Sequence, residues 1–325
     1  MKRLMIYFFY DKDGIVDDYV PYFLEKFKPF CEEICTVVNG NMTDESKQKL
    51  EKYSSLVLER ENIGFDSGAY KYAIEHYGYE KIREYDELIL ANFTMFGPIF
   101  SPAELFDKME KRDCDFWGIT KYRANEHSFA EIKIDEHIQS YFLVYKKNIL
   151  CSKDFEDYWN TLQTATTYEE AIAFHELRTT KFFEERNYKS DIYIPFKKYL
   201  QEIKNKAYFY SIIQQIKEDR MPFIKRKIFL IEDCNNYYNE IKGGIVSLLE
   251  YLEKNSDYNL NMIYENVRRT NYINIDKSFI KKQYYRCKIM QYIILPKRKH
   301  YHEKSEKYKN LYRLIKFLEK RKIEL

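Results

Sequence analysis

The sequence has 325 residues, of which 45% are hydrophobic and 18% are aromatic, so it can bury one or two sizeable cores. A formal net charge of +3 excludes a strongly charged chain overall, but the charge is divided unevenly. Residues 1–197 hold 26 Lys and Arg against 36 Asp and Glu, whereas residues 198–325 hold 28 against 15. Such a basic second half is typical of a segment that faces an anionic partner.

Six cysteines occur without a CxxC pair or an accompanying group of histidines, which argues against a zinc site and a disulfide framework. No run approaches the roughly 20 apolar residues of a membrane span. No signal peptide is visible, because the apolar run at 4–10 is short and acidic residues follow it. We therefore expect a cytoplasmic protein whose only membrane contact is at a surface.

Strand and helix patterns alternate along the first 197 residues. Strands are predicted at 4–10, 34–38, 56–58, 87–91, 116–120, 139–145 and 191–194. Helices are predicted at 16–27, 44–53, 67–76, 102–111, 155–162 and 168–185. This alternation predicts an α/β fold with a mainly parallel sheet flanked by helices. Residues 121–137 are polar and irregular, and we expect them to form a mobile loop over the site.

Beyond residue 197 the alternation stops and helical patterns dominate, at 208–217, 238–253 and 310–322. We therefore divide the chain into a domain at 1–197 and a basic, mainly helical region at 198–325. The last pattern puts four apolar side chains on one helical face among basic residues: Leu311, Leu314, Ile315 and Leu318. Such a helix either lies on an anionic membrane surface or packs on the body of the protein.

Two loops stand out between residues 60 and 98. The loop Arg60–Gly68 is polar, contains glycine and opens a helix, whose free N–H groups suit a phosphate or a ribose. The strand at 87–91 runs into Asn92, Phe93 and Thr94, at the edge of the sheet where α/β proteins bind ligands. Taken singly, each loop also fits an ordinary turn with a helix cap.

These two loops, with the spacing between them, resemble the rhamnan synthesis F family of bacterial cell-surface polysaccharide proteins. The resemblance continues through the motifs at 115–120, 137–142 and 222–226, and it covers residues 1 to 230. It implies a GT-A-like fold, with a Rossmann-type sheet that binds a nucleotide-sugar. It also implies a glycosyltransferase, since many members are linked to rhamnose transfer.

The crevice at the strand ends is where such a fold would hold the donor. We expect donor contacts from Tyr10, Asn39, Asn62, Gly64, Asp66, Asn92, Thr94, Lys225 and Arg226. Asp66 would accept hydrogen bonds from the base or the ribose, although it could instead cap its helix. Lys225 and Arg226 would balance the diphosphate charge, although they also fit a solvated basic turn.

Many GT-A enzymes bind a divalent metal through an Asp-x-Asp at the end of the fourth strand. Here that position reads Asn92-Phe93-Thr94, and in relatives the middle residue is commonly Asp. We predict no metal site beyond a single ligand from Asn92, so Mg²⁺ or Mn²⁺ would rest mainly on the donor diphosphate. No other cofactor is implied.

The segment at 174–183 holds the candidate base. Inverting GT-A enzymes often carry an acidic pair here; Glu176 matches the second acid, the usual base, and His175 replaces the first. The alternative is a solvated helix face. We expect the acceptor to contact Trp117, Gln139, Ser140 and His175.

Three functions compete. The first is an inverting glycosyltransferase that moves a sugar, L-rhamnose from dTDP-L-rhamnose, onto a lipid-linked glycan at the inner face of the plasma membrane. The second is a catalytically silent subunit that binds nucleotide-sugar or glycan. The third, a nucleotidyltransferase, is disfavoured because the loop at 10–14 is too acidic for a triphosphate. Nucleic-acid binding is not expected, because the first half is acidic and no recognition motif is present.

Overall fold

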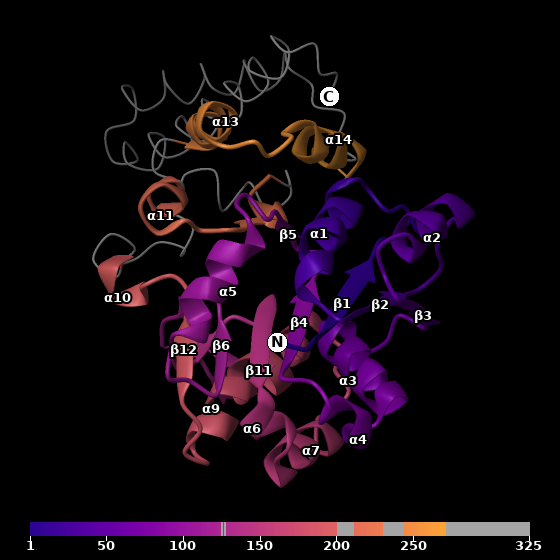
Figure 1. The fold of residues 1–325 in the computed structure, drawn as a ribbon, viewed down its shortest axis with the longest axis vertical. Helices are drawn as coiled ribbons and strands as arrows, with labels where there is room; N and C mark the ends of the chain where they lie inside the picture. Colours follow the sequence, from indigo (N-terminus) through magenta and orange to yellow (C-terminus); the bar gives the residue numbers. More distant parts are fainter. Residues whose placement is uncertain (125, 127, 200–210, 230–243, 271–325) are drawn as a thin grey trace, which may run out of the picture. The chain divides into compact units, whose positions relative to one another are not determined.

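The computed structural model describes residues 1–124, 126, 128–199, 211–229 and 244–270 (Figure 1). The chain forms two compact units, Met1–Lys198 and Tyr199–Leu325. The predicted division lay between residues 197 and 198. The first unit contains the sheet and every sequence motif except the one at 222–226.

The described residues of the first unit build a seven-stranded sheet in the order β12-β6-β11-β4-β1-β2-β3. Its strands are β1 (Arg3–Tyr10), β2 (Glu33–Asn39), β3 (Leu56–Arg60), β4 (Glu87–Asn92), β6 (Phe116–Gly118), β11 (Phe142–Lys146) and β12 (Ser190–Ile192). All neighbouring pairs are parallel except those of β11, which runs antiparallel to both β4 and β6. This mainly parallel sheet with one reversed strand beside β4 confirms the predicted GT-A-like fold class.

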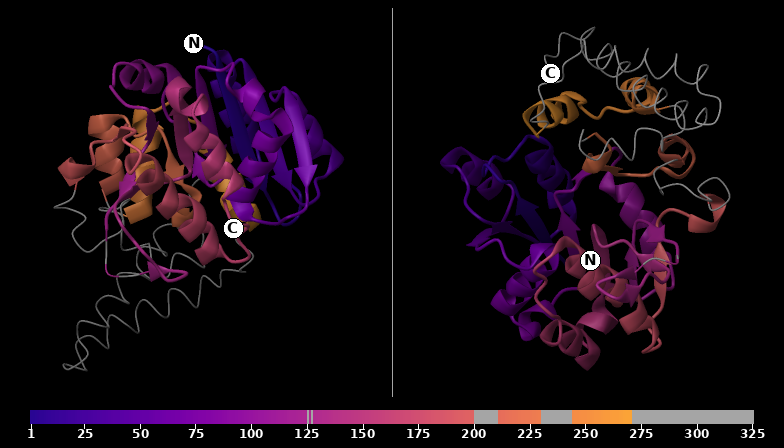
Figure 2. Two further views of the ribbon diagram at one scale, coloured as in Figure 1. Left: turned by 90° about the horizontal axis from the view of Figure 1, so that it is seen from below. Right: turned by 180° about the vertical axis from the view of Figure 1, so that it is seen from behind.

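Helices cover both faces of this sheet (Figure 2). The helices of this unit are α1 (Tyr19–Phe27), η1 (Lys28–Phe30), α2 (Asp44–Glu51), α3 (Phe65–Tyr77), α4 (Tyr79–Ile82), α5 (Pro102–Glu110), α6 (Lys147–Leu150), α7 (Lys153–Asn160), α8 (Tyr168–Ala171), the π-helix η2 (Ile172–Leu177) and α9 (Arg178–Glu184). The short helix α10 (Phe196–Tyr199) spans the boundary between the two units. The predicted helix at 168–185 is therefore the continuous run α8-η2-α9.

The central strand β1 is apolar on both faces, as expected for a parallel strand covered by helices on each side. Leu4, Ile6 and Phe8 belong to the core under α3. Tyr7 points to the opposite face, where its ring lies 5.0 Å from that of Phe23 on α1. The alternation of these side chains explains why sequence periodicity predicted a buried strand here.

The segment at 121–137, predicted to be irregular, contains two short antiparallel pairs. Strand β7 (Lys121–Tyr122) pairs with β10 (His137–Ile138), and β8 (Ser128–Phe129) pairs with β9 (Ile132–Lys133). Ala130 and Glu131 join β8 to β9 with φ values of 45° and 65°, the backbone of a tight hairpin. The prediction missed this hairpin because neither residue is the Gly or Asn that usually marks such a turn. The other short strand of this unit is β5 (Met95–Phe96).

The second unit is mainly helical in its described part. Its elements are α11 (Ile212–Asp219), β13 (Ile224–Lys225), η4 (Arg226–Phe229), α13 (Gly244–Asn255) and α14 (Asn261–Thr270). The predicted helices at 208–217 and 238–253 overlap α11 and α13, whereas the one at 310–322 lies outside the described residues. Within the described ranges, no helix is both long enough and apolar enough to cross a membrane.

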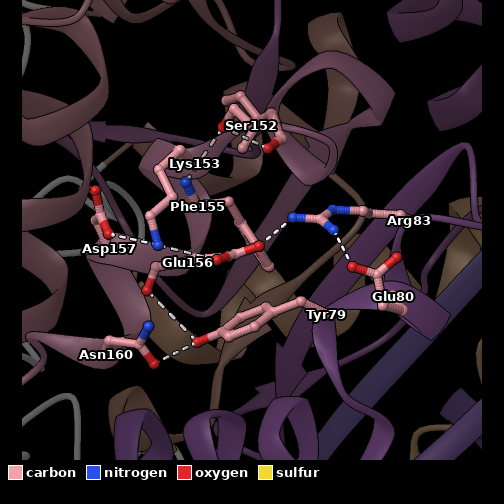
Figure 3. Close-up of polar contacts among 10 residues, drawn as sticks. Tyr79, Glu80, Arg83, Ser152, Lys153, Phe155, Glu156, Asp157 and Asn160 are labelled. Carbon is pink, nitrogen blue, oxygen red and sulfur yellow. Dashed lines mark hydrogen bonds and ion pairs between the residues drawn. The ribbon is translucent and has the colours of Figure 1, made fainter.

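A network of charged side chains links α4 to α7 (Figure 3). Arg83 pairs with both Glu80 and Glu156, and Glu156 also pairs with Lys153 at 3.1 Å. The hydroxyl of Tyr79 donates to Asn160 Oδ1 at 2.9 Å. The exposed outer pairs to Glu80 and Lys153 contribute little individually, whereas the partly buried Arg83–Glu156 pair joins the two helices directly.

A buried ion pair joins β1 to β4, whose parallel register places Arg3 beside Glu87. Arg3 Nε donates to Glu87 Oε2 at 2.6 Å, and the two residues are 5% and 2% exposed. The guanidinium also donates to Glu110 Oε1 at 2.5 Å and stacks 4.1 Å from the centre of the Phe106 ring. Both charges are therefore satisfied inside the protein.

We expect Glu87→Ala to lower the free energy of unfolding by up to about 3–5 kcal/mol, because it removes the buried partner of Arg3 and leaves that charge only the half-exposed carboxylate of Glu110. Glu84→Ala is the matched control, because Glu84 pairs with Lys2 and Lys81 at the surface and should cost less than about 1 kcal/mol. Urea unfolding of both variants measures the difference. Equal losses would show that the Arg3–Glu87 pair has no special weight.

Candidate functional site

The loop before α3 folds tightly onto the first turn of that helix. Gly64 and Phe65 have φ values of 76° and 54°, in the left-handed region that favours glycine. A Cβ atom on Gly68 would lie 2.9 Å from the carbonyl oxygen of Ile63, closer than packing allows. The two glycines of this motif are therefore explained by the backbone, and Gly64 shapes the loop whether or not it touches a ligand.

A buried amide holds the same loop against the end of β2. Arg60 Nη1 donates to Asn39 Oδ1 at 3.0 Å and to the carbonyl oxygen of Ile63 at 2.9 Å. The Asn39 amide donates in turn to Asn62 Oδ1 and to the carbonyl oxygen of Phe65, both at 3.3 Å. Asn39 is 0% exposed, so it positions the loop from beneath, while Asn62 is exposed on its surface.

The two loops predicted to act together meet through Asp66 and Asn92. Asn92 Nδ2 donates to Asp66 Oδ2 at 3.1 Å, which links the start of α3 to the end of β4. The other oxygen of Asp66 accepts from the Ser67 backbone N–H at 2.9 Å. Asn92 Oδ1 accepts from Thr94 Oγ1 at 2.6 Å and from Thr94 N at 3.2 Å, so both lone pairs of this oxygen are occupied. Thr94 itself is exposed.

The surroundings of Asp66 favour its protonated form. Burial is the largest cause, the nearby charge of Glu176 adds to it, and together they raise the pKa of Asp66 from 3.8 to about 6. Hydrogen bonds from Ser67 and Asn92 oppose the shift without cancelling it. The ring of His175, the residue before the candidate base, lies 6.0 Å from the ring of Tyr70, so the helix with the candidate base packs beside α3.

Glu176 lies on the π-helix η2, an irregularity that often marks functional sites. Its Oε2 accepts two hydrogen bonds from Ser140, at 2.9 Å from the backbone N–H and 2.7 Å from Oγ. Its Oε1 lies 3.5 Å from Nε2 of His137, and the side chain is 20% exposed. These contacts hold Glu176 in place. Glu169 on α8, by contrast, is exposed to solvent.

Three residues predicted to contact the acceptor lie in the core. His175 is 1% exposed, its Nδ1 lies 2.8 Å from the Tyr158 hydroxyl, and burial lowers its pKa to about 4, so the ring is neutral near pH 7. Trp117 is 0% exposed, and Gln139 is 5% exposed and accepts from Thr120 Oγ1 at 2.9 Å. We leave these three out of the proposed acceptor site. Ser140 stays in it, with the added role of holding Glu176.

Phe93, where the family resemblance led us to expect Asp, is partly buried and packs against the core. Its ring lies 5.5 Å from that of Phe8 and 5.7 Å from that of Phe9. Within the residues that the structure describes, no group of three or more His, Cys, Asp or Glu side chains could hold a metal ion. The amide oxygen of Asn92 already accepts two hydrogen bonds from Thr94, so the side chains at the end of β4 do not fit a protein-held metal.

The remaining predicted donor residues fall into two groups. Tyr10 ends β1 in register with Asn39, and so lies at the same edge of the sheet. Lys225 and Arg226 belong to the second unit, where Arg226 Nε donates to Asn266 Oδ1 at 3.1 Å. Their contact with the donor stays a prediction. The sequence analysis did not single out His137, although it lies in a motif that carried the family resemblance.

Two comparisons of sequence bear on the family. The model of the family described as rhamnan synthesis protein F matches residues 34–311, which confirms the resemblance drawn from the motifs. The uncharacterized protein y4gN of Sinorhizobium fredii (strain NBRC 101917 / NGR234) is 25% identical over 151 residues, 46% of this chain. That alignment spans 38% of the relative's own length.

Solved structures resemble this chain distantly. The inositol-1-phosphate CTP transferase from T. maritima has 12% identity and a TM-score of 0.37, covering 58% of this chain and 84% of that one. Core-mannan synthase A from Aspergillus fumigatus, in its Mn/GDP form, has 10% identity and a TM-score of 0.30, covering 55% and 66%. Glucosyl-3-phosphoglycerate synthase from Mycobacterium tuberculosis has 9% identity and a TM-score of 0.30, covering 45% and 57%.

The raised pKa of Asp66 gives a test by stability. Its folded-state pKa of about 6 exceeds the usual 3.8, so its favourable contribution is full below about pH 4 and is lost as pH rises to about 6. We expect Asp66→Asn to gain stability relative to the parent across this window, by at most about 3 kcal/mol. Urea unfolding at pH 4, 5, 6 and 7 measures the gain.

Asp113→Asn is the control for this experiment. The exposed Asp113 pairs with Lys189, whose hydrogen bond lowers the pKa of Asp113, so the variant should show no such gain. A difference between Asp66→Asn and the parent that stays constant with pH would mean that Asp66 is not held in a site that disfavours its charge.

Proposed function

The chain belongs to the rhamnan synthesis protein F family, and on that basis we propose that it is a glycosyltransferase that uses a nucleotide-sugar donor. One observation supports this most directly. Asp66 at the start of α3 bonds to Asn92 at the end of β4, and Glu176 on a separate segment lies near enough for its charge to raise the pKa of Asp66. Open α/β sheets bind their ligands at this edge, beyond the carboxyl ends of the strands.

In this proposal Glu176 is the general base. Two hydrogen bonds from Ser140 fix Oε2 and stabilise the charged carboxylate, which is the form that can take a proton. The carboxylate accepts the proton of an acceptor hydroxyl while that oxygen attacks the sugar carbon bonded to the diphosphate. The nucleoside diphosphate leaves from the opposite side, so the configuration at that carbon inverts.

Asp66 serves the donor rather than the proton transfer. With a pKa of about 6 it is mostly ionised at pH 7, where it accepts hydrogen bonds, and it becomes a donor as the pH falls to about 6. The exposed Asn62 and Thr94 lie on the same two loops, and they are open to a base or a ribose. Family membership favours L-rhamnose as the sugar and dTDP-L-rhamnose as the donor, with a growing surface polysaccharide as the product.

The diphosphate charge must be balanced without a metal held by the end of β4. We propose that Mg²⁺ or Mn²⁺ carried mainly by the diphosphate itself supplies this balance, and the contribution of Lys225 and Arg226 stays a prediction. The basic segment at 281–322 lies outside the described residues. We propose that it attaches the protein to an anionic membrane surface, where a lipid-linked acceptor would be found.

A second function is favoured by Phe93. Its ring packs against Phe8 and Phe9, so the end of β4 presents no acidic side chain where the family resemblance led us to expect one. A subunit that binds nucleotide-sugar or glycan without turnover would tolerate this loss. The two functions differ in one respect, since both bind the donor but only the enzyme transfers its sugar.

We expect Glu176→Gln to reduce turnover by about 10²-fold or more, with the dissociation constant of the donor nearly unchanged, because the amide cannot take a proton. Glu169→Gln is the matched control. Glu169 is exposed on α8, so this variant should leave turnover unchanged. Release of nucleoside diphosphate from dTDP-L-rhamnose measures turnover, and calorimetry measures binding. Parental turnover in Glu176→Gln would remove Glu176 from the mechanism.

Donor choice and metal dependence are tested together by thermal shift. At 100 times its dissociation constant, a ligand that binds only the folded protein stabilises it by about 2.7 kcal/mol, a shift of several degrees in Tm. We expect dTDP-L-rhamnose to shift Tm more than UDP-sugars or GDP-sugars do, and the shift to persist in part with EDTA. Asp66→Ala and Asn62→Ala should reduce it, whereas Asp113→Ala should not.

Two results would contradict this scheme. A shift of equal size in Asp66→Ala, Asn62→Ala and the parent would place the donor elsewhere. Complete loss of the Tm shift on chelation, restored by Mn²⁺, would show that donor binding requires a metal. The protein would then hold that metal through side chains other than those at the end of β4.

A further inference from the structure

His137 is fixed in one tautomer by the backbone. Its side chain is 4% exposed, and Nδ1 lies 2.7 Å from the carbonyl oxygen of Asp135. A carbonyl oxygen can only accept a hydrogen bond, so Nδ1 must carry the proton. In the neutral ring the other nitrogen, Nε2, is therefore unprotonated and can only accept a hydrogen bond.

The unprotonated Nε2 of His137 faces the carboxylate of Glu176. Nε2 lies 3.5 Å from Glu176 Oε1, while the other oxygen, Oε2, already accepts both donors of Ser140. Two acceptors that face each other at this distance are joined only when a proton lies between them. Catalytic hydrogen bonds are often this long without substrate and shorten when it binds. The pair is thus built to receive one proton.

The ring is also held in place from several elements. Tyr122 stacks on it with ring centres 5.7 Å apart, and the backbone N–H of Ile138 donates to Thr180 Oγ1 at 2.9 Å. Other titratable and charged groups surround His137 and Glu176. They are Tyr122 on β7, Asp66 on α3, Lys181 on α9, Tyr141 and the carboxylate of Asp135, which lies 3.6 Å from Lys181 Nζ. The Glu176 carboxylate lies 3.5 Å from Nε2.

We propose that His137 is a positioning residue behind Glu176 and forms with it a dyad that holds a single proton. This rests on the proposed function. The acceptor hydroxyl gives its proton to Glu176, and the new O–H on Oε1 donates to Nε2 or passes its proton to it, leaving imidazolium and carboxylate. The attacking oxygen forms the bond to the sugar carbon, and the bond from that carbon to the diphosphate breaks with its electrons on the leaving group.

The dyad is tested without substrate by ¹⁵N NMR of the histidine side chains in the full chain, with His137→Gln to assign the signal. We expect the neutral ring to carry its proton on Nδ1. The ¹⁵N chemical shift of Nε2 should change in Glu176→Gln, because the carboxylate that faces it is gone, and should stay unchanged in Glu169→Gln. A proton on Nε2 in the neutral ring, or an unchanged Nε2 shift in Glu176→Gln, would overturn the proposal, whatever the substrate of the enzyme.

Kinetics test the role in transfer. We expect His137→Gln to lower kcat by about 10-fold to 100-fold with little change in the KM of dTDP-L-rhamnose, and to move the acidic limb of the pH profile to lower pH. Thr180→Val is the control, because it removes the acceptor of the Ile138 N–H and loosens the same strand without touching the proton. An unmoved limb in His137→Gln, or an equal movement in Thr180→Val, would overturn the role. Absence of turnover in the parent would count against the proposed function and leave the NMR test in force.

Discussion

The hydrogen bond from Asn92 to Asp66 is the constraint on which the site depends. It joins the end of β4 to the first turn of α3, two segments brought to the same edge by the parallel order of the sheet. Because Asn92 also ends β4 and accepts from Thr94, one amide sets both the turn after the strand and the orientation of the Asp66 carboxyl group. The charge of Glu176 then acts on a carboxyl group whose position is already fixed.

The sequence predicted the parts of this arrangement that depend on local pattern. Alternating strands and helices determine that strand ends share an edge, so Asp66 and Asn92 could be expected to lie near each other. The pattern could not separate His175 from Glu176. A π-helix shifts the phase of the helical faces, and this shift puts His175 in the core and Glu176 at the site.

Contacts between distant segments were also beyond prediction. Ser140 was predicted to contact an acceptor, because a polar residue beside an apolar strand suggests a site. Its two bonds to Glu176 join residues 36 positions apart, and no spacing rule encodes them. The β8–β9 hairpin was missed for a different reason, since Ala130 and Glu131 adopt positive φ values without the usual turn residues. Tertiary context fixes both features.

Two carboxylates near each other repel when both are charged, and the surroundings of Asp66 and Glu176 divide the roles. Asp66 accepts hydrogen bonds from backbone N–H groups and from the neutral amide of Asn92, and burial raises its pKa to about 6. Glu176 receives both donors of Ser140 on one oxygen and faces the imidazole of His137 with the other. Environments this different make Asp66 the group more easily protonated and give Glu176 hydrogen-bond donors that stabilise its carboxylate. The packing of Phe93 fits the same division, because a third carboxylate at the end of β4 would add to the repulsion unless a metal came with it.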